Sequence, residues 1–188
     1  MRELILGGQK SGKSRCAEER AAAWLAAAPG RSAVMLATAL AGDDEMRERI
    51  ARHRQDRAAR VPSMRTVEVP DRLAEALRLH SRPQCLLVVD CLTLWLTQQL
   101  MPPTGEGLAG EPLRAVVDDL LLAIGEAPGP VVCVSNEIGM GLSPMSSETR
   151  RFVDELGRLH QALAARCEQV TLMVAGIEWP LKRKADTA

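Results

Sequence analysis

Short apolar runs recur along the chain, and polar or alanine-rich stretches separate them. The runs are continuous rather than alternating, which is typical of strands covered on both faces. They predict six strands, at residues 2–6, 33–38, 64–69, 85–90, 130–136 and 170–175. Strands that alternate with helices indicate a parallel sheet built from right-handed crossovers. The sequence therefore predicts an α/β fold with a mostly parallel sheet flanked by helices.

The stretches between the runs have helical composition or periodicity. They predict helices at residues 15–28, 43–59, 72–79, 92–100, 112–126 and 148–167. Residues 101–111 contain two prolines and three glycines and predict a flexible connection. The polar tail at residues 182–188 is expected to fray. A length of 188 residues suits a single domain spanning residues 1–188.

Composition and charge exclude several classes of protein. The chain carries 24 Lys plus Arg and 24 Asp plus Glu, so no global field indicates nucleic acid or an anionic membrane as a partner. The most apolar stretch, residues 85–96, is interrupted by Asp90 and is too short for a bilayer span. Five cysteines without a C-x-x-C pair argue against a disulfide framework or a zinc site. We expect a soluble, cytoplasmic protein with reduced cysteines, of which Cys85 and Cys133 are buried.

A glycine-rich stretch near the amino terminus matches a phosphate-binding pattern. The pattern G-x-x-x-x-G-K-[ST] is followed without a gap by Gly7, Gly8, Gln9, Lys10, Ser11, Gly12, Lys13 and Ser14. Its backbone N–H groups can surround a phosphate, and the next helix adds the positive end of its dipole. A strand before it and a helix after it favour a nucleotide site over a chance match. Lys13 is expected to reach the outer phosphates, and Ser14 to hold Mg²⁺.

Ligands of open α/β sheets collect beyond the carboxyl ends of the strands. This rule selects Thr38, Glu68, Asp90 and residues 135–137 as further candidates. Asp90 closes an apolar strand, where a carboxylate needs a cation or hydrogen-bond donors. We therefore predict that it binds Mg²⁺ directly or through water; the alternative is that it caps the following helix.

An arginine-rich helix is predicted after the second strand. Met46, Ile50 and His53 fall at i, i+4 and i+7, so the imidazole continues the apolar stripe and is expected to face the body of the protein. A neutral imidazole is a competent nucleophile towards phosphorus. The nearby cations are Arg49, Arg52, Arg54 and Arg57. The alternative is a solvated basic face with a structural histidine.

The remaining candidates carry weaker signals. His80 and His160 have no partner pattern and are interpreted as structural. Residues 136–144 are predicted to form a loop with two glycines after the fifth strand, at an edge of the sheet where loops commonly bind substrates. This loop is not the N-K-x-D element with which regulatory GTPases read guanine.

Three blocks of residues together resemble a known enzyme family. They are the phosphate loop at residues 7–14, the run from Ala37 to His53, and residues 136–141. They are similar to the bifunctional adenosylcobinamide kinase and adenosylcobinamide-phosphate guanylyltransferase of cobalamin biosynthesis. The likeness extends from the first strand to about residue 176. The phosphate loop is shared by many proteins, whereas the other two blocks are far more specific.

The resemblance implies a P-loop, RecA-like architecture and two reactions in one chain. The first phosphorylates adenosylcobinamide with ATP or GTP, with Mg²⁺ as cofactor. The second transfers GMP from GTP to the resulting phosphate through a guanylylated histidine, which corresponds to His53. The resemblance also implies a homo-oligomer, with a trimer as the expected state. The implied nucleotide-binding residues are those of the phosphate loop together with Ala37, Thr38, Ala39, Arg54, Gln55, Asp56, Arg57, Glu68 and Asp90.

Two other functions remain open from the sequence. The first is a single-activity phosphate-loop kinase for another small alcohol, in which His53 is structural. The second is a non-enzymatic nucleotide switch, which the lack of an N-K-x-D element disfavours.

Overall fold

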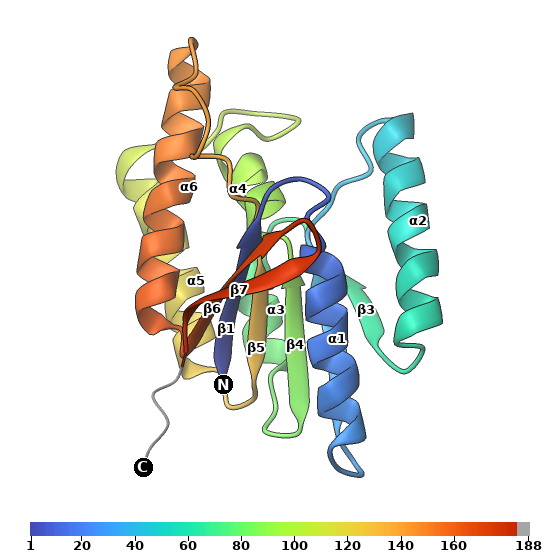
Figure 1. The fold of residues 1–188 in the computed structure, drawn as a ribbon. Helices are drawn as coiled ribbons and strands as arrows, with labels where there is room; N and C mark the ends of the chain where they lie inside the picture. The colour runs from blue at the N-terminus through green and yellow to red at the C-terminus, as the bar shows by residue number, and fades with distance from the viewer. Residues whose placement is uncertain (184–188) are drawn as a thin grey trace.

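The computed structural model describes residues 1–183 as a seven-stranded sheet with helices on both faces (Figure 1). The strand order is β3-β2-β4-β5-β1-β6-β7. The expected tail lies outside the described residues from residue 184 onward. The strands are β1 (Arg2–Gly7), β2 (Ser32–Ala37), β3 (Arg65–Glu68), β4 (Cys85–Asp90), β5 (Val131–Val134), β6 (Gln169–Val174) and β7 (Ile177–Lys182).

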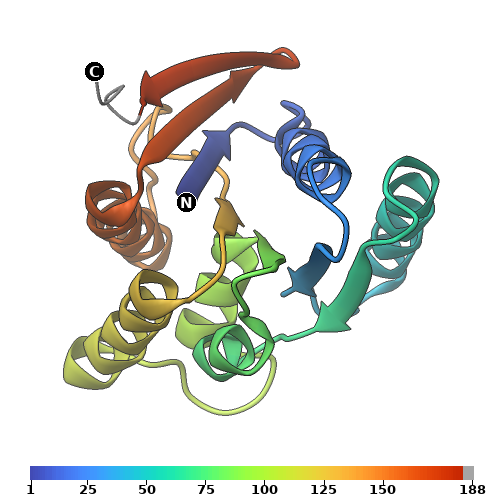
Figure 2. The same cartoon turned by 90° about the horizontal axis from the view of Figure 1, so that it is seen from below.

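The helices form two layers around the sheet. Viewed from below, α1 and α2 lie over one face and α3 to α6 over the other (Figure 2). The helices are α1 (Lys13–Ala26), α2 (Asp44–Arg60), α3 (Leu73–His80), α4 (Leu92–Leu100), α5 (Gly110–Glu126) and α6 (Ser147–Arg166). Strand β4 and helix α4 coincide with the predicted ranges. The fold class predicted from the apolar runs is confirmed.

The central strands are buried because their continuous apolar runs fill both layers. In β4, Leu86 and Val88 pack with the α1 layer, and Leu87 and Val89 pack with the α3 to α6 layer. All of these side chains are fully buried. A strand covered on both faces loses any polar alternation, so its sequence reads as one apolar run.

Strand β7 is absent from the sequence prediction. It pairs antiparallel with β6 through a tight turn at Ala175 and Gly176, which both have positive φ values. Ile177, Trp179 and Leu181 point to one side and are exposed. Because β7 is an edge strand with one exposed face and an internal proline, it lacks the continuous apolar run that marks the other strands.

Helix α2 stands apart from the sheet and is almost entirely solvated. Asp43 caps its amino terminus by accepting a hydrogen bond of 2.7 Å from the backbone N–H of Met46. Arg57 is its one buried residue. The helix therefore leaves a space beside the carboxyl ends of β2 and β3, where the candidate site lies.

Three further observations bear on the composition-based expectations. Between residues 1 and 183, none of the helices is both long and apolar enough to span a bilayer. All five cysteines are free and buried. Burial raises the pKa of Cys16, Cys91 and Cys167 to about 12, which keeps these thiols protonated and unreactive.

Candidate active site

The phosphate loop joins β1 to α1 in the geometry that its glycines allow. Gly12 caps α1 with a φ of 102°, so the first turn of the helix opens toward the loop. Lys13 is buried, and its Nζ donates a hydrogen bond of 2.6 Å to the carbonyl oxygen of Gly8. Ser11 Oγ is buried without a hydrogen-bond partner among residues 1–183. A buried polar atom of this kind often marks a ligand site.

Gly7 is the glycine whose replacement is expected to distort this loop most. An added Cβ would lie 2.5 Å from the carbonyl oxygen of Met173 and 2.6 Å from Ser11 Oγ, at a φ of 154°. Gly7→Ala should therefore lower the free energy of unfolding by about 1–3 kcal/mol, measured by urea denaturation. Gly8→Ala is the matched control because a Cβ there meets nothing within 4 Å. Equal stability of the two variants would contradict the prediction.

Asp90 lies at the end of β4 and interacts electrostatically with Lys13 of the loop. Its carboxylate is half-buried and has no hydrogen-bond partner within the described residues. Helix α4 is capped by Cys91 rather than Asp90, so the alternative role as a helix cap is wrong. Burial lowers the pKa of Lys13, while Cys91 and Asp90 oppose the shift and Arg49 adds to it. Lys13 and Asp90 thus lie within electrostatic reach of each other.

Thr38 fixes the chain that follows Asp90. Its fully buried hydroxyl donates to the carbonyl oxygen of Cys91 at 2.7 Å and accepts from the N–H of Cys91 at 2.8 Å. The strand register sets Ala37 beside both Glu68 and Asp90. The predicted candidates on β2, β3 and β4 are therefore neighbours at one edge of the sheet.

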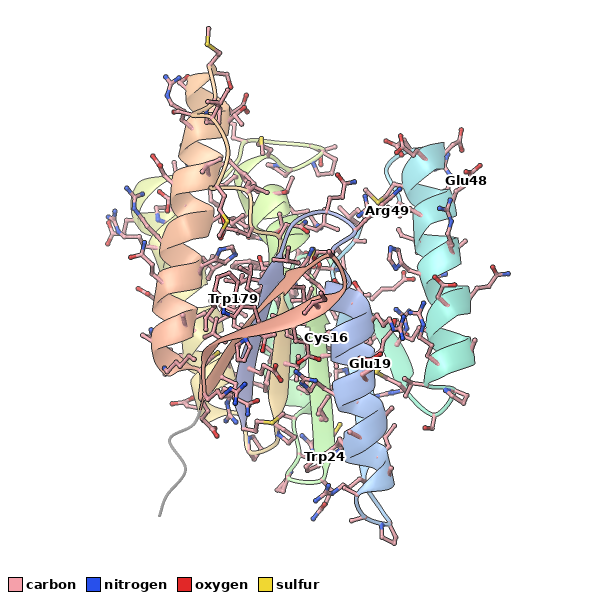
Figure 3. The ribbon with its side chains drawn as sticks, in the orientation of Figure 1. Cys16, Glu19, Trp24, Glu48, Arg49 and Trp179 are labelled. Atoms are coloured by element: carbon pink, nitrogen blue, oxygen red, sulfur yellow. The ribbon has the colours of Figure 1, made fainter. Side chains whose placement is uncertain are left out.

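One face of α2 is turned toward the phosphate loop. Figure 3 shows Arg49 on the side of α2 that faces the loop and Glu48 on the opposite side. Burial lowers the pKa of Arg57, and Glu18 and Asp90 oppose the shift. Arg49 therefore acts on Lys13, and Arg57 acts on Asp90. His53 lies four residues from each arginine, so the three side chains share this face.

His53 itself is exposed, whereas Met46 and Ile50 are half-buried. The side of α2 that packs toward the protein therefore includes Met46, Ile50 and the buried Arg57, and not His53. Because α2 stands away from the sheet, the ring is not packed in the core. The ring is therefore open to solvent, on the face of α2 that also carries Arg49 and Arg57.

Two cavities lie between α2 and the strand ends. Their volumes are about 230 and 530 Å³, and Arg54 and Glu68 line both and form an ion pair. Ala39 lines the larger cavity and Arg57 the smaller. Gln55 and Asp56 are exposed on α2, and Asp56 pairs with Arg60 at 3.7 Å. Four of the nine predicted nucleotide-binding residues outside the loop therefore line these two cavities, namely Ala39, Arg54, Arg57 and Glu68.

No group of three or more His, Cys, Asp or Glu side chains suited to a metal ion occurs in the part of the chain that the structure describes. Ser14 and Asp90 offer a hydroxyl and a carboxylate oxygen, the donor types that Mg²⁺ takes. An ion at this position would draw its other ligands from nucleotide phosphates and water. The residues present therefore fit a nucleotide-bound Mg²⁺.

A buried polar network behind the phosphate loop was not predicted. His160 Nε2 lies 2.8 Å from Ser135 Oγ, which lies 3.0 Å from Thr93 Oγ1. His160 Nδ1 lies 3.7 Å from the carboxylate of Glu137, whose backbone N–H donates to the carbonyl oxygen of Gly7 at 2.9 Å. The network connects α6, α4 and β5 to the start of the loop. Its members are far apart in sequence, so only the fold reveals it.

His160 should make the stability depend on pH. Burial lowers its pKa below the ordinary value of 6.5, and Glu137 only partly opposes this. As pH falls below about 6.5, the unfolded chain binds the proton first, so the stability present above this pH is lost. The free energy of unfolding should therefore fall less steeply between pH 7 and pH 5 in His160→Gln than in the wild type. An identical slope in both proteins, measured by urea denaturation, would contradict this. His53→Gln is the comparison variant, because His53 is exposed on α2.

The phosphate loop, the buried lysine and the carboxylate at the end of β4 define a phosphate-loop nucleotide-binding protein. The family described as "Cobinamide kinase / cobinamide phosphate guanyltransferase" (CobU) matches residues 3–181. The chain belongs to this family. The resemblance found in the sequence is thereby confirmed.

Similar proteins agree with this membership. "Bifunctional adenosylcobalamin biosynthesis protein CobP" of Pseudomonas aeruginosa is 50% identical over 182 residues, covering 97% of this chain and 98% of that protein. "Bifunctional adenosylcobalamin biosynthesis protein CobU" of Escherichia coli is 36% identical over 189 residues, covering 95% and 98%. The solved structure of flagellar accessory protein FlaH from Methanocaldococcus jannaschii gives a TM-score of 0.50 at 11% identity, covering 97% of this chain and 78% of that one. This last likeness concerns the fold alone.

Proposed function

We propose that the chain phosphorylates adenosylcobinamide with ATP or GTP and then transfers GMP from GTP to adenosylcobinamide phosphate through guanylylated His53. The products of the second reaction are adenosylcobinamide-GDP and pyrophosphate. The observation that carries the proposal is the shared face of Arg49, His53 and Arg57 on α2. Its two arginines act on Lys13 and Asp90, the charged groups of the phosphate site.

In the kinase step, the phosphate loop holds the triphosphate and the acceptor supplies the nucleophile. The hydroxyl oxygen of the aminopropanol group bonds to the γ-phosphorus while the bond to the bridging oxygen breaks. The electron pair leaves with the nucleoside diphosphate, and the hydroxyl proton passes to solvent. Lys13 and the backbone N–H groups neutralise charge on the transferred and leaving groups. His53 has no part in this step.

In the transferase step, two displacements at the α-phosphorus follow each other. A nitrogen of His53 bonds to this phosphorus, and the bond to pyrophosphate breaks with its electron pair leaving on pyrophosphate. An oxygen of adenosylcobinamide phosphate then bonds to the same phosphorus, and the electron pair of the broken P–N bond returns to the imidazole. A covalent intermediate divides one difficult transfer into two easier ones. Lys13 stabilises the leaving pyrophosphate.

We also propose Mg²⁺ as the cofactor, held by Ser14 and Asp90 together with the phosphates. When bound, it neutralises charge on the phosphate oxygens. The half-buried carboxylate of Asp90, without a hydrogen-bond partner among residues 1–183, supports this position. Arg57 interacts electrostatically with the same carboxylate and balances its charge further.

The implied homo-oligomer remains a prediction. The exposed apolar side chains of β7, Ile177, Trp179 and Leu181, support association between copies. Light scattering coupled to size exclusion tests this. The mass of three chains is expected, and the mass of a single chain would contradict the prediction.

Labelled GTP tests the two proposed reactions in one chain. With adenosylcobinamide as acceptor, label from the γ-phosphate should appear in adenosylcobinamide phosphate. With adenosylcobinamide phosphate as acceptor, label from the α-phosphate should appear in adenosylcobinamide-GDP. Transfer of γ-label alone would leave the single-activity kinase, which the exposure of His53 favours as the second candidate function.

A further inference from the structure

An uncharged, apolar loop stands beside the phosphate loop. It connects β5 to α6, and residues 138–147 contain no Asp, Glu, Lys or Arg in a chain that is 26% charged. Its large apolar side chains are strongly exposed: Ile138 by 41%, Met140 by 77%, Leu142 by 98% and Met145 by 97%. A contiguous exposed apolar segment of this kind usually marks a binding surface.

Both ends of this apolar loop are fixed, and its first residues are tied to the phosphate site. The N–H of Glu137 donates to the carbonyl oxygen of Gly7 at 2.9 Å, and Glu137 accepts from the N–H of Gly139 at 2.6 Å. At the far end, Arg150 donates to the carbonyl oxygens of Pro144 at 2.9 Å and Met145 at 2.6 Å. In Figure 1 the loop rises from β5 along α6, at the same end of the sheet as the β1–α1 loop. The apolar loop is thus attached to the phosphate loop at its first residues and to α6 at its far end.

The transfer of GMP from His53 to the acceptor indicates from which side of the sheet the acceptor approaches. In-line attack requires the incoming oxygen to approach the α-phosphorus from the side opposite the leaving imidazole. His53 lies on α2, over the same face of the sheet as α1, whereas α6 covers the other face (Figure 2). The acceptor therefore approaches from the side on which the β5–α6 loop lies.

We propose that the apolar loop binds the corrinoid macrocycle of the acceptor through Ile138, Met140, Leu142 and Met145. This inference rests on the proposed function, because it assigns the acceptor side of the same site. The macrocycle has broad apolar faces and neutral amide side chains, which suit a surface without charge. Methionine side chains adapt to an irregular apolar ligand. The loop holds the macrocycle while the acceptor oxygen reaches the nucleotide.

Calorimetric titration with cobinamide tests the assignment without requiring catalysis. The double variant Met140→Ser and Leu142→Ser should bind cobinamide about tenfold more weakly than the wild type because it removes two apolar contacts. Leu122→Ser is the matched control, since Leu122 is 52% exposed on α5, away from the loop. This control should bind cobinamide as the wild type does.

Guanylylation by GTP alone separates this proposal from the proposed function. The loop variant should form the guanylyl adduct of His53 to the same extent as the wild type, because no acceptor takes part. Unchanged cobinamide affinity in the loop variant would overturn the proposal. If the mass of this variant in light scattering also changed, the loop would instead be assigned to contacts between copies. Absence of the adduct from the wild type would instead refute the proposed function.

Discussion

His53→Ala is expected to lower GMP transfer to adenosylcobinamide phosphate on the order of 10⁴-fold or more, the scale for removing a covalent nucleophile. The imidazole shares a face of α2 with Arg49 and Arg57, which act on Lys13 and Asp90. Transfer of the γ-phosphate to adenosylcobinamide should persist, because a hydroxyl is the nucleophile in that step. The measurement is the formation rate of each product, assayed separately.

His80→Ala is the matched control for this variant. His80 lies at the end of α3, and its Nδ1 is 3.3 Å from a guanidinium nitrogen of Arg65, away from the phosphate loop. It should keep both activities. Equal loss of both activities in His53→Ala would show that His53 supports folding or nucleotide binding rather than covalent catalysis.

Lys13→Met is expected to lower both activities by about 10²–10³-fold, since the two reactions share one phosphate site. Lys13 is buried, and its Nζ donates to the carbonyl oxygen of Gly8 within the phosphate loop. Methionine has a similar length and can occupy the buried space that the aliphatic part of the Lys13 side chain fills, so the variant should keep its fold. Rates of both reactions at saturating nucleotide, with a thermal melt, provide the test.

Lys182→Met is the control for the lost charge. Lys182 ends β7, and its Nζ donates to the carbonyl oxygen of Ala164 at 2.9 Å. Its replacement should change neither activity. A Lys13→Met variant that lost only one of the two reactions would contradict a common phosphate site.

Much of the fold follows from local patterns in the sequence. Apolar runs such as that of β4 are long enough to identify buried strands, and Gly12 and Lys13 identify the turn into α1. Strand β7 was not predicted because it is an exposed edge strand with an internal proline and therefore lacks a continuous apolar run. Its ion pair between Glu178 and Arg20 of α1, at 2.5 Å, joins residues far apart in the sequence and leaves no periodic signal.

The parts of the candidate site that are contiguous in the sequence could be predicted. The parts that the fold brings together from distant segments could not. The phosphate loop and Asp90 could be identified from the residues that precede and follow them. The network of His160, Ser135 and Thr93 could not, because its members come from α6, the segment after β5, and α4. The periodicity of α2 likewise predicted which side chains share a face, but not that the helix stands apart and leaves His53 exposed.

The most direct test of the central claim is to locate the guanylyl group after incubation with GTP labelled at the α-phosphate. The labelled protein is digested, and the modified residue is identified by mass spectrometry. We expect an acid-labile, base-stable label on the peptide that contains His53, and no label on His53→Ala. A wild-type protein that stays unlabelled, or that carries the label on another residue, would contradict the account.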